Sequence, residues 1–139
     1  MTFIPPRGIP QETAPKLFPI LGEENIRKLL KYHYEFISKS EIRDLFPKGE
    51  ELYMAAQKNA DFFIQILGGP PYFSMKYGPP KMRQRHLRFS INYKKRKVWL
   101  KCFFKAIQEL TKEVVIPKTE LKKFKLFLIR FSEWMVNEK

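Results

Sequence analysis

Apolar residues recur every three or four positions along most of the chain, a spacing that predicts amphipathic helices. A first helix is expected over 22–38, and a short turn of helix over 42–46 is stopped by Pro47. A second long helix is expected over 50–67, with Lys58 and Asp61 outside its apolar stripe. The stripe of the first helix contains Ile26, Leu29, Leu30, His33, Tyr34 and Ile37, and that of the second contains Leu52, Ala55, Ala56, Asn59, Phe62, Phe63 and Ile66.

The second half of the chain continues the helical pattern. Gly68 and Gly69 end the second long helix, because glycine tolerates the left-handed conformation of a C-cap. After a proline-rich loop, residues 80–87 leave room for about two turns of helix, and a longer helix is expected over 93–110. Pro117 opens the last helix. Its apolar stripe contains Leu121, Phe124, Leu128, Phe131 and Met135. No stretch has the period of a strand, so the sequence predicts an all-α fold.

The N-terminal residues differ from the rest of the chain. Pro5, Pro6, Pro10 and Pro15 remove backbone donors at a density that no helix tolerates. We therefore expect residues 1–16 to form an extended N-terminal arm and residues 17–139 to form one domain. The chain has 139 residues, which suits a single hydrophobic core.

Composition narrows the class of protein. The formal net charge is +13, which favours polyanions as partners, but the 27 Lys and Arg residues are spread along the whole chain. Cys102 is the single cysteine, so no internal disulfide forms, and this predicts a reducing compartment such as the cytoplasm. The N-terminus lacks the apolar core of a signal peptide, and no window is apolar for long enough to span a membrane.

Polar residues on apolar stripes mark candidate chemistry. His33 and Tyr34 lie on the first long helix and Asn59 lies on the second. Burying such a group unpaired costs about 1–3 kcal/mol, so a shared partner is expected if the three converge. That partner is one of the three groups themselves, a water molecule or a ligand.

His86 differs in kind, because it lies on a short helix among Arg83, Arg85 and Arg88. These cations disfavour protonation of the imidazole, which leaves a nitrogen available as an iron ligand, and they attract carboxylates. Heme would match both features, because its iron binds an imidazole and its propionate carboxylates pair with arginines. The alternative is a surface histidine on a solvated basic turn.

Other kinds of site fit the chain poorly. Structural zinc takes four Cys or His ligands, and the sequence offers only His33, His86 and Cys102. No nucleophile elbow occurs. The glycines and prolines over 68–71 lack the spacing of a phosphate-binding loop.

From about Leu17 to Leu110 the sequence resembles the truncated hemoglobins, and most closely their second group. Several motifs occur in the right order and at the right spacing, which makes the match strong. The motifs are Gly22-Glu23-Glu24, Tyr34-Glu35-Phe36-Ile37, Asp44-Leu45-Phe46-Pro47, Gly68-Gly69-Pro70, Arg85-His86 followed by Phe89, and Trp99 in the next helix.

The resemblance implies a two-over-two helical sandwich around heme b. It implies that His86 is the proximal ligand of the iron and that Arg85 or a neighbouring cation meets a propionate. On the distal side it implies that Tyr34 and Trp99 present an O–H and an N–H to the bound ligand. The remaining residues implied to line the heme pocket are Phe46, Ala55, Asn59 and Met82.

Two features depart from the family. His33 stands where phenylalanine is common in the family. It could form a hydrogen bond with Tyr34 or shift the pKa of Tyr34, or it could approach the iron. Alternatively, it packs at the helix boundary and bonds a backbone carbonyl. The proline-rich arm is longer than a minimal truncated globin needs. Two roles for the arm stay open, thermal stabilisation of the fold and dimerisation. The chain is expected to be a monomer or a homodimer.

Two functions follow. The first is a heme protein that binds oxygen, carbon monoxide and nitric oxide at a five-coordinate iron. The resemblance associates it with oxygen transport or with nitric oxide or peroxide detoxification, which needs an external reductase. The second is a basic helical module that binds nucleic acid, suggested by the net charge and by the Lys94-Lys95-Arg96-Lys97 run. The absence of helix-turn-helix spacing counts against it.

Overall fold

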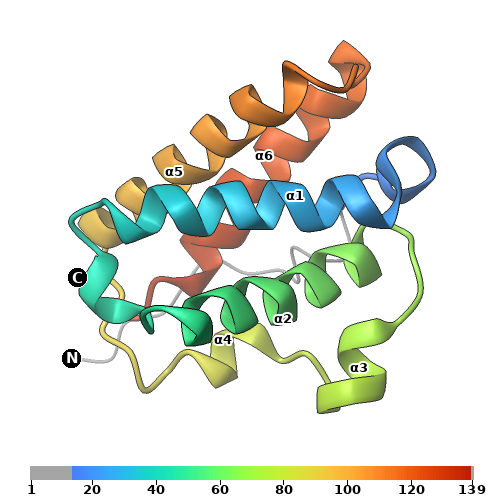
Figure 1. Ribbon diagram of the computed structural model, residues 1–139. Helices are drawn as coiled ribbons and strands as arrows, with labels where there is room; N and C mark the ends of the chain where they lie inside the picture. The colour runs from blue at the N-terminus through green and yellow to red at the C-terminus, as the bar shows by residue number, and fades with distance from the viewer. Residues whose placement is uncertain (1–13, 139) are drawn as a thin grey trace.

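The computed structural model describes residues 14–138, all of whose regular elements are helices, so the predicted all-α fold is confirmed. Most of the predicted arm, residues 1–13, lies outside the described part. The helices, labelled in Figure 1, are α1 (Phe18–Ser38), the 3-10 turn η2 (Arg43–Leu45), α2 (Glu50–Ile66), α3 (Tyr72–Tyr77), α4 (Met82–Arg85), α5 (Tyr93–Thr111) and α6 (Lys118–Met135).

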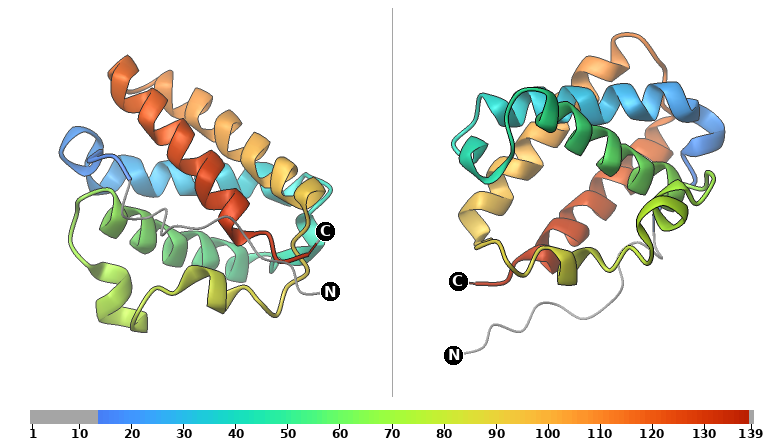
Figure 2. Two further views of the ribbon diagram at one scale, coloured as in Figure 1. Left: turned by 180° about the vertical axis from the view of Figure 1, so that it is seen from behind. Right: turned by 60° about the horizontal axis from the view of Figure 1, so that its bottom comes forward.

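The four long helices form two pairs, as the two-over-two arrangement predicts. Helix α1 packs against α2, and α5 packs against α6 (Figures 1 and 2). Helix α1 also packs against α5, so it joins the two pairs. The short helix α3 lies on α2, and α4 contacts α6. Six of the largest fully buried side chains are phenylalanines, namely Phe62, Phe63, Phe73, Phe103, Phe124 and Phe127.

The helix boundaries differ from the prediction in three places. Helix α1 begins at Phe18, and Gly22, with φ of 76° and ψ of 171°, breaks it near the residue where the sequence pattern began. Helix α3 forms within the predicted proline-rich loop. Proline disfavours the interior of a helix, but Pro71 is the N-cap of α3 and lies just before its first turn, where proline is tolerated. Helix α4 has one turn instead of two, and His86 follows it as the C-cap.

Asp61 lies inside the fold and not outside the apolar face of α2 as predicted. Its side chain is 2% exposed, and its two carboxylate oxygens accept hydrogen bonds from Arg27 Nη2 at 2.8 Å and from Lys76 Nζ at 3.0 Å. A buried carboxylate is tolerated when cations and hydrogen bonds compensate its lost hydration. This ion pair network joins α1, α2 and α3.

Gly68 and Gly69 end α2 for two separate reasons. Gly68 has a φ of +103°, which L side chains rarely adopt. Gly69 has an ordinary φ, but a Cβ there would lie 2.6 Å from Phe18 Cδ2 and 2.8 Å from Ile64 Cγ2. The backbone N–H of Phe18 donates to the Leu67 carbonyl at 2.9 Å. The start of α1 and the end of α2 are therefore in close contact.

His33 joins α1 to α5 in the core. It is fully buried, and its Nε2 lies 3.1 Å from the backbone carbonyl oxygen of Trp99. Burial lowers the pKa of His33 to about 3, against a smaller opposing effect of this hydrogen bond. The imidazole is therefore neutral, and Nε2–H is the donor to the carbonyl. Its Nδ1 has no hydrogen-bond partner among the described residues.

We expect Gly69→Ala to lower the free energy of unfolding by about 1–3 kcal/mol, the usual cost of forcing an extra methyl group into a packed site. Two side chains and the Ile64 carbonyl, which would lie 2.9 Å from the new Cβ, must shift to make room. Chemical denaturation measures the change. A loss below about 0.5 kcal/mol, typical of surface substitutions, would show that the contact between α1 and α2 is looser than described.

The buried His33 makes stability depend on pH. Its folded pKa of about 3 lies below the ordinary 6.5, so the unfolded chain binds the extra proton as the pH falls. The contribution is complete above pH 6.5 and is lost progressively toward pH 3. Between pH 7 and pH 5 it amounts to roughly 2 kcal/mol.

Denaturant titrations of wild type and His33→Phe at both pH values isolate this contribution, because all other titrating groups are shared. The stability of the variant should fall by roughly 2 kcal/mol less than that of the wild type over this range. An equal fall in both proteins would contradict a buried neutral imidazole at this position.

Candidate functional site

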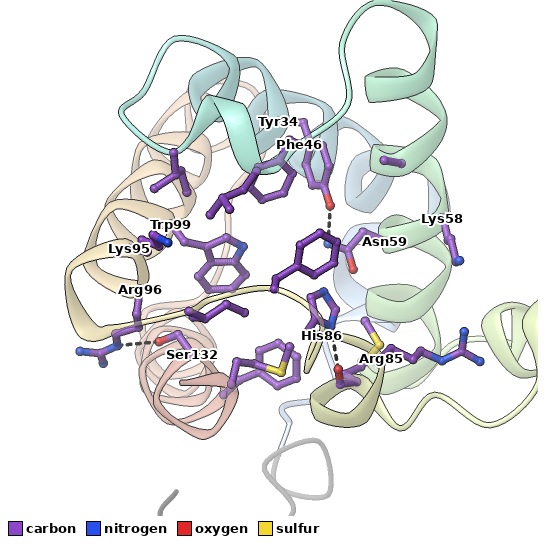
Figure 3. Close-up of a pocket in the computed structure, with 18 of the residues that line it drawn as sticks. Tyr34, Phe46, Lys58, Asn59, Arg85, His86, Lys95, Arg96, Trp99 and Ser132 are labelled. Carbon is purple, nitrogen blue, oxygen red and sulfur yellow. Dashed lines mark hydrogen bonds between the residues drawn. The ribbon is translucent and has the colours of Figure 1, made fainter. Parts of the chain in front are cut away.

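A cavity of about 560 Å³ opens between the two helix pairs. All the helices contribute to its wall, and Figure 3 shows Tyr34, Trp99 and His86 converging on it from α1, α5 and the end of α4. Every residue that the sequence assigned to the site lines this cavity, with the exception of His33. The volume lies in the range of roughly 300–1,000 Å³ that is typical of ligand and cofactor pockets.

His86 presents one ring nitrogen to the cavity. Its Nδ1 lies 2.6 Å from the carbonyl oxygen of Met82, one turn earlier, so Nδ1–H donates there and the Nε2 lone pair stays free (Figure 3). Burial is the main cause that lowers the pKa of His86, and the positive charges of Arg88, Arg85 and Lys58 lower it further, while the bond to Met82 acts the other way. The ring is thus a neutral donor suited to a metal.

The basic surroundings of His86 differ in detail from the sequence interpretation. Burial has a larger effect on its pKa than the cations do. Arg83 turns away, and its Nε donates to the Trp134 carbonyl on α6 at 3.2 Å. Lys58 on α2, which the sequence placed outside the apolar stripe, lies near the His86 ring in place of Arg83.

Tyr34 and Asn59 form a hydrogen-bonded pair on the wall opposite His86. The Asn59 amide Nδ2 donates to the Tyr34 hydroxyl oxygen at 2.8 Å. The Tyr34 oxygen is thus an acceptor in this bond, and its own proton is free to donate into the cavity. Burial raises the pKa of Tyr34 to about 12, so the hydroxyl stays protonated at neutral pH.

Phe46 and Ala55 shape the space around Tyr34. The Phe46 ring meets the Tyr34 ring edge to face, with ring centroids 5.5 Å apart, which restricts how the tyrosine can turn. Ala55, one helical turn before Asn59 on α2, offers only a methyl group. The hydrogen-bond donors of this wall therefore come from α1 and α5, and from Asn59.

Trp99 supplies a second donor to the same space. Its indole ring packs against His33 and Phe103, with centroid distances of 5.0 and 5.4 Å. The indole N–H makes no hydrogen bond to any residue that the structure describes, and the ring faces the cavity (Figure 3). A ligand in the cavity would therefore meet two uncommitted protons, one from Tyr34 and one from Trp99.

Cations surround the mouth of the cavity, and no Asp or Glu is among its described lining residues. Arg85 is largely committed to the loop before α4, since its Nη2 donates to the carbonyls of Tyr77 at 2.8 Å and Pro79 at 2.9 Å. Lys58 and Arg88 are exposed, and their recorded partners are the aromatic rings of Tyr77 and Phe89. Lys58 and Arg88 are therefore the better placed to bind carboxylates.

Several lining residues escaped the sequence analysis of the site. Phe131 and Met135 were on the predicted apolar stripe of the last helix, but periodicity cannot separate core from cavity wall. Lys58 follows Ala55 by three positions on α2. This helical spacing places both residues on one side of the helix and could have identified Lys58 as a lining residue. Arg96, part of the basic run, bonds Ser132 Oγ at 3.0 Å and pairs with Glu133 at 3.2 Å, which ties α5 to α6.

His33 lies behind Tyr34 and Trp99 and not on the cavity wall. Its single N–H is used by the Trp99 carbonyl. The sequence left several interpretations of His33 open. The structure agrees with the one in which the imidazole forms a hydrogen bond with a backbone carbonyl.

Among the described residues, the side chains do not form a cluster of metal ligands of their own. No cluster of three or more His, Cys, Asp or Glu that could hold a metal occurs between residues 14 and 138. Heme iron, in contrast, needs only a single imidazole from the protein, because the porphyrin supplies its other in-plane ligands. The cavity has the imidazole, the aromatic walls and the cations that such a group requires.

Among residues 14–138, none of the helices has the length and apolar character of a transmembrane segment.

Comparison with known proteins agrees with this chemistry. The family model of the bacterial-like globins matches residues 16–134. Group 2 truncated hemoglobin YjbI of Bacillus subtilis is 32% identical over 94 residues, which cover 67% of this chain and 70% of that protein.

Solved structures show the same similarity. Phosphate-bound Hell's gate globin IV superimposes with a TM-score of 0.85 at 35% identity, covering 98% of this chain and 82% of that one. The group II truncated hemoglobin of Bacillus anthracis gives 0.76 at 30% identity, covering 88% and 95%. These comparisons lend no support to a nucleic-acid-binding module. The chain belongs to the truncated hemoglobins of the bacterial-like globin family, is most similar to their group II, and is a heme globin that binds diatomic ligands.

Proposed function

We propose that this globin binds oxygen through a heme b held by His86, with Tyr34 and Trp99 as hydrogen-bond donors to the ligand. Heme, when bound, supplies an iron atom with one coordination position open to a diatomic gas. The observation that carries the proposal is the placement of two uncommitted donors, the Tyr34 O–H and the Trp99 N–H, across one cavity from the free Nε2 of His86.

On the proximal side, the carbonyl of Met82 orients the His86 ring. The bond from Nδ1–H fixes the tautomer, so Nε2 faces the cavity without a proton to lose. Burial lowers the pKa of His86, which favours the neutral ring. A neutral imidazole oriented in this way would hold the iron of heme without first releasing a proton or turning.

On the distal side, Tyr34 and Trp99 would donate hydrogen bonds to a ligand that carries partial negative charge when bound. Tyr34 is held by Asn59 and Phe46, so little rotational freedom is lost when its O–H donates. Because burial strengthens hydrogen bonds, the pair should slow ligand release. Slow release would also suit a reaction of retained oxygen with nitric oxide, whose repeated turnover would need an external electron donor.

The edge of the cavity and the single cysteine support the type of cofactor. We place the two propionates near Lys58 and Arg88, with Arg85 beside them, because these cations lie at the mouth without carboxylate partners among the described residues. Cys102 is the one cysteine of the sequence, and it does not line the cavity. No thiol is therefore available to attach heme covalently, which fits heme b.

We expect His86→Gly to lose heme, because no other imidazole lines the cavity to replace it as the iron ligand. The absorption spectrum of the purified variant should lack the Soret band that the wild type shows. Adding free imidazole should restore heme binding, since the small ligand fits the space left by the ring. A variant that keeps heme with an unchanged spectrum would overturn the proximal assignment.

We expect Tyr34→Phe and Trp99→Phe each to speed oxygen dissociation roughly tenfold, because each removes a hydrogen bond worth about 1.4 kcal/mol in a buried site. Stopped-flow or flash photolysis gives the rate constants. Tyr32→Phe and Trp134→Phe are matched controls, because neither residue lines the cavity, and both should leave the rate unchanged. Unchanged dissociation in both Tyr34 and Trp99 variants would refute the distal assignment.

A further inference from the structure

We propose that His33 is a positioning residue that holds the Trp99 indole in the orientation from which its N–H faces the cavity. The proposal depends on the role of Trp99 proposed above only for its effect on ligand release. The placement of Trp99 itself can be measured independently.

His33 contacts both the backbone and the side chain of Trp99. Its Nε2–H donates to the Trp99 carbonyl across the α1–α5 interface at 3.1 Å, and its ring meets the indole edge to face with centroids 5.0 Å apart. His33 also packs on Phe103, with centroids 4.2 Å apart, and Phe103 packs on the indole at 5.4 Å. The hydrogen bond ties α5 to α1 at the residue from which the indole projects, and the rings limit the rotation of the indole.

Among the described residues, the Trp99 side chain itself makes no hydrogen bond, and the polar contact nearest to it is the one that His33 makes with the Trp99 carbonyl. Within residues 14–138, its remaining aromatic neighbours are Phe103 and Phe131, which limit the ring by packing alone. Packing against phenylalanine permits sliding and tilting, whereas a hydrogen bond to the adjacent carbonyl has a narrow range of distance and angle. The His33 bond is therefore the most specific restraint near this indole.

The unpaired Nδ1 argues that His33 has a function beyond filling space. It is the one buried side-chain N or O atom without a hydrogen-bond partner among the described residues. A buried acceptor without a partner lowers stability, and phenylalanine would fill a similar volume without that penalty. What phenylalanine cannot do is donate to the Trp99 carbonyl. A residue that is unfavourable for stability and specific in its one hydrogen bond fits a positioning role.

The test follows the Trp99 indole N–H directly. In heme-loaded, ¹⁵N-labelled protein carrying Trp134→Phe, Trp99 is the single tryptophan, so its indole resonance is unambiguous in the diamagnetic carbon monoxide complex. His33→Phe should speed exchange of this indole proton with solvent. His33→Gln should keep the slow exchange of the parent, because the glutamine amide can donate to the same carbonyl.

Two further measurements separate positioning from a general structural role. His33→Phe should leave the thermal midpoint at pH 7 unchanged or higher, yet speed oxygen dissociation a few-fold, less than Trp99→Phe, because the indole is displaced but present. Ile107→Val, which removes a buried methyl group elsewhere on α5, is the control for mild destabilisation and should change neither the exchange of the indole proton nor the dissociation rate.

The outcomes are distinguishable. An indole proton that exchanges equally fast in His33→Phe and in the parent overturns the proposal, and so does equally fast exchange in His33→Gln and His33→Phe. If the exchange responds as expected while Trp99→Phe leaves oxygen dissociation unchanged, His33 does position the indole and the proposed distal function of Trp99 is the part that fails.

Discussion

The position of α1 between α2 and α5 determines most of this structure. Successive residues on a helix point about 100° apart, so neighbours on α1 can face different partners. His33 turns toward α5 and bonds the Trp99 carbonyl, while Tyr34 turns toward α2 and accepts a hydrogen bond from Asn59. One helix therefore aligns cavity-lining groups of both helix pairs. The contacts of Phe18 with Gly69 and of Arg27 with Asp61 hold α1 in that position.

The electrostatic character of the cavity changes along its depth. Tyr34, Trp99 and His86 are neutral polar groups in the interior, and the shifted pKa values of Tyr34 and His86 keep both in the uncharged form near pH 7. The charged side chains stand at the mouth, where water still solvates Lys58 and Arg88. This separation avoids the large cost of a buried charge and still provides cations for the carboxylates of a bound cofactor.

Helical periodicity predicted the long helices and the stripe residues, because amphipathic patterns report burial directly. Tyr34, Asn59 and His86 stood out because each breaks an apolar or basic pattern, and the structure places all three on one cavity. Asp61 was misplaced, because its burial depends on Arg27 and Lys76, which are distant in sequence. Pattern alone cannot show such pairing.

Other features also required three-dimensional information. Gly69 appeared to be needed for its backbone conformation, whereas its reason is the approach of Phe18 from another helix. His33 shares a stripe with Tyr34, and only the crossing of α1 and α5 separates the cavity wall from the layer behind it. The roles of Lys58 and Arg88 depend on where the cavity opens, which no linear spacing fixes.

The cavity of about 560 Å³ also links folding to cofactor supply. Its wall residues come together only in the native fold, so heme would bind the native chain in preference to the unfolded chain. By mass action the folded fraction then rises with the free heme concentration. Newly made chains in a heme-poor cell would spend longer partly open and exposed to proteases. The amount of this globin in a cell would thus follow heme biosynthesis as well as its own expression.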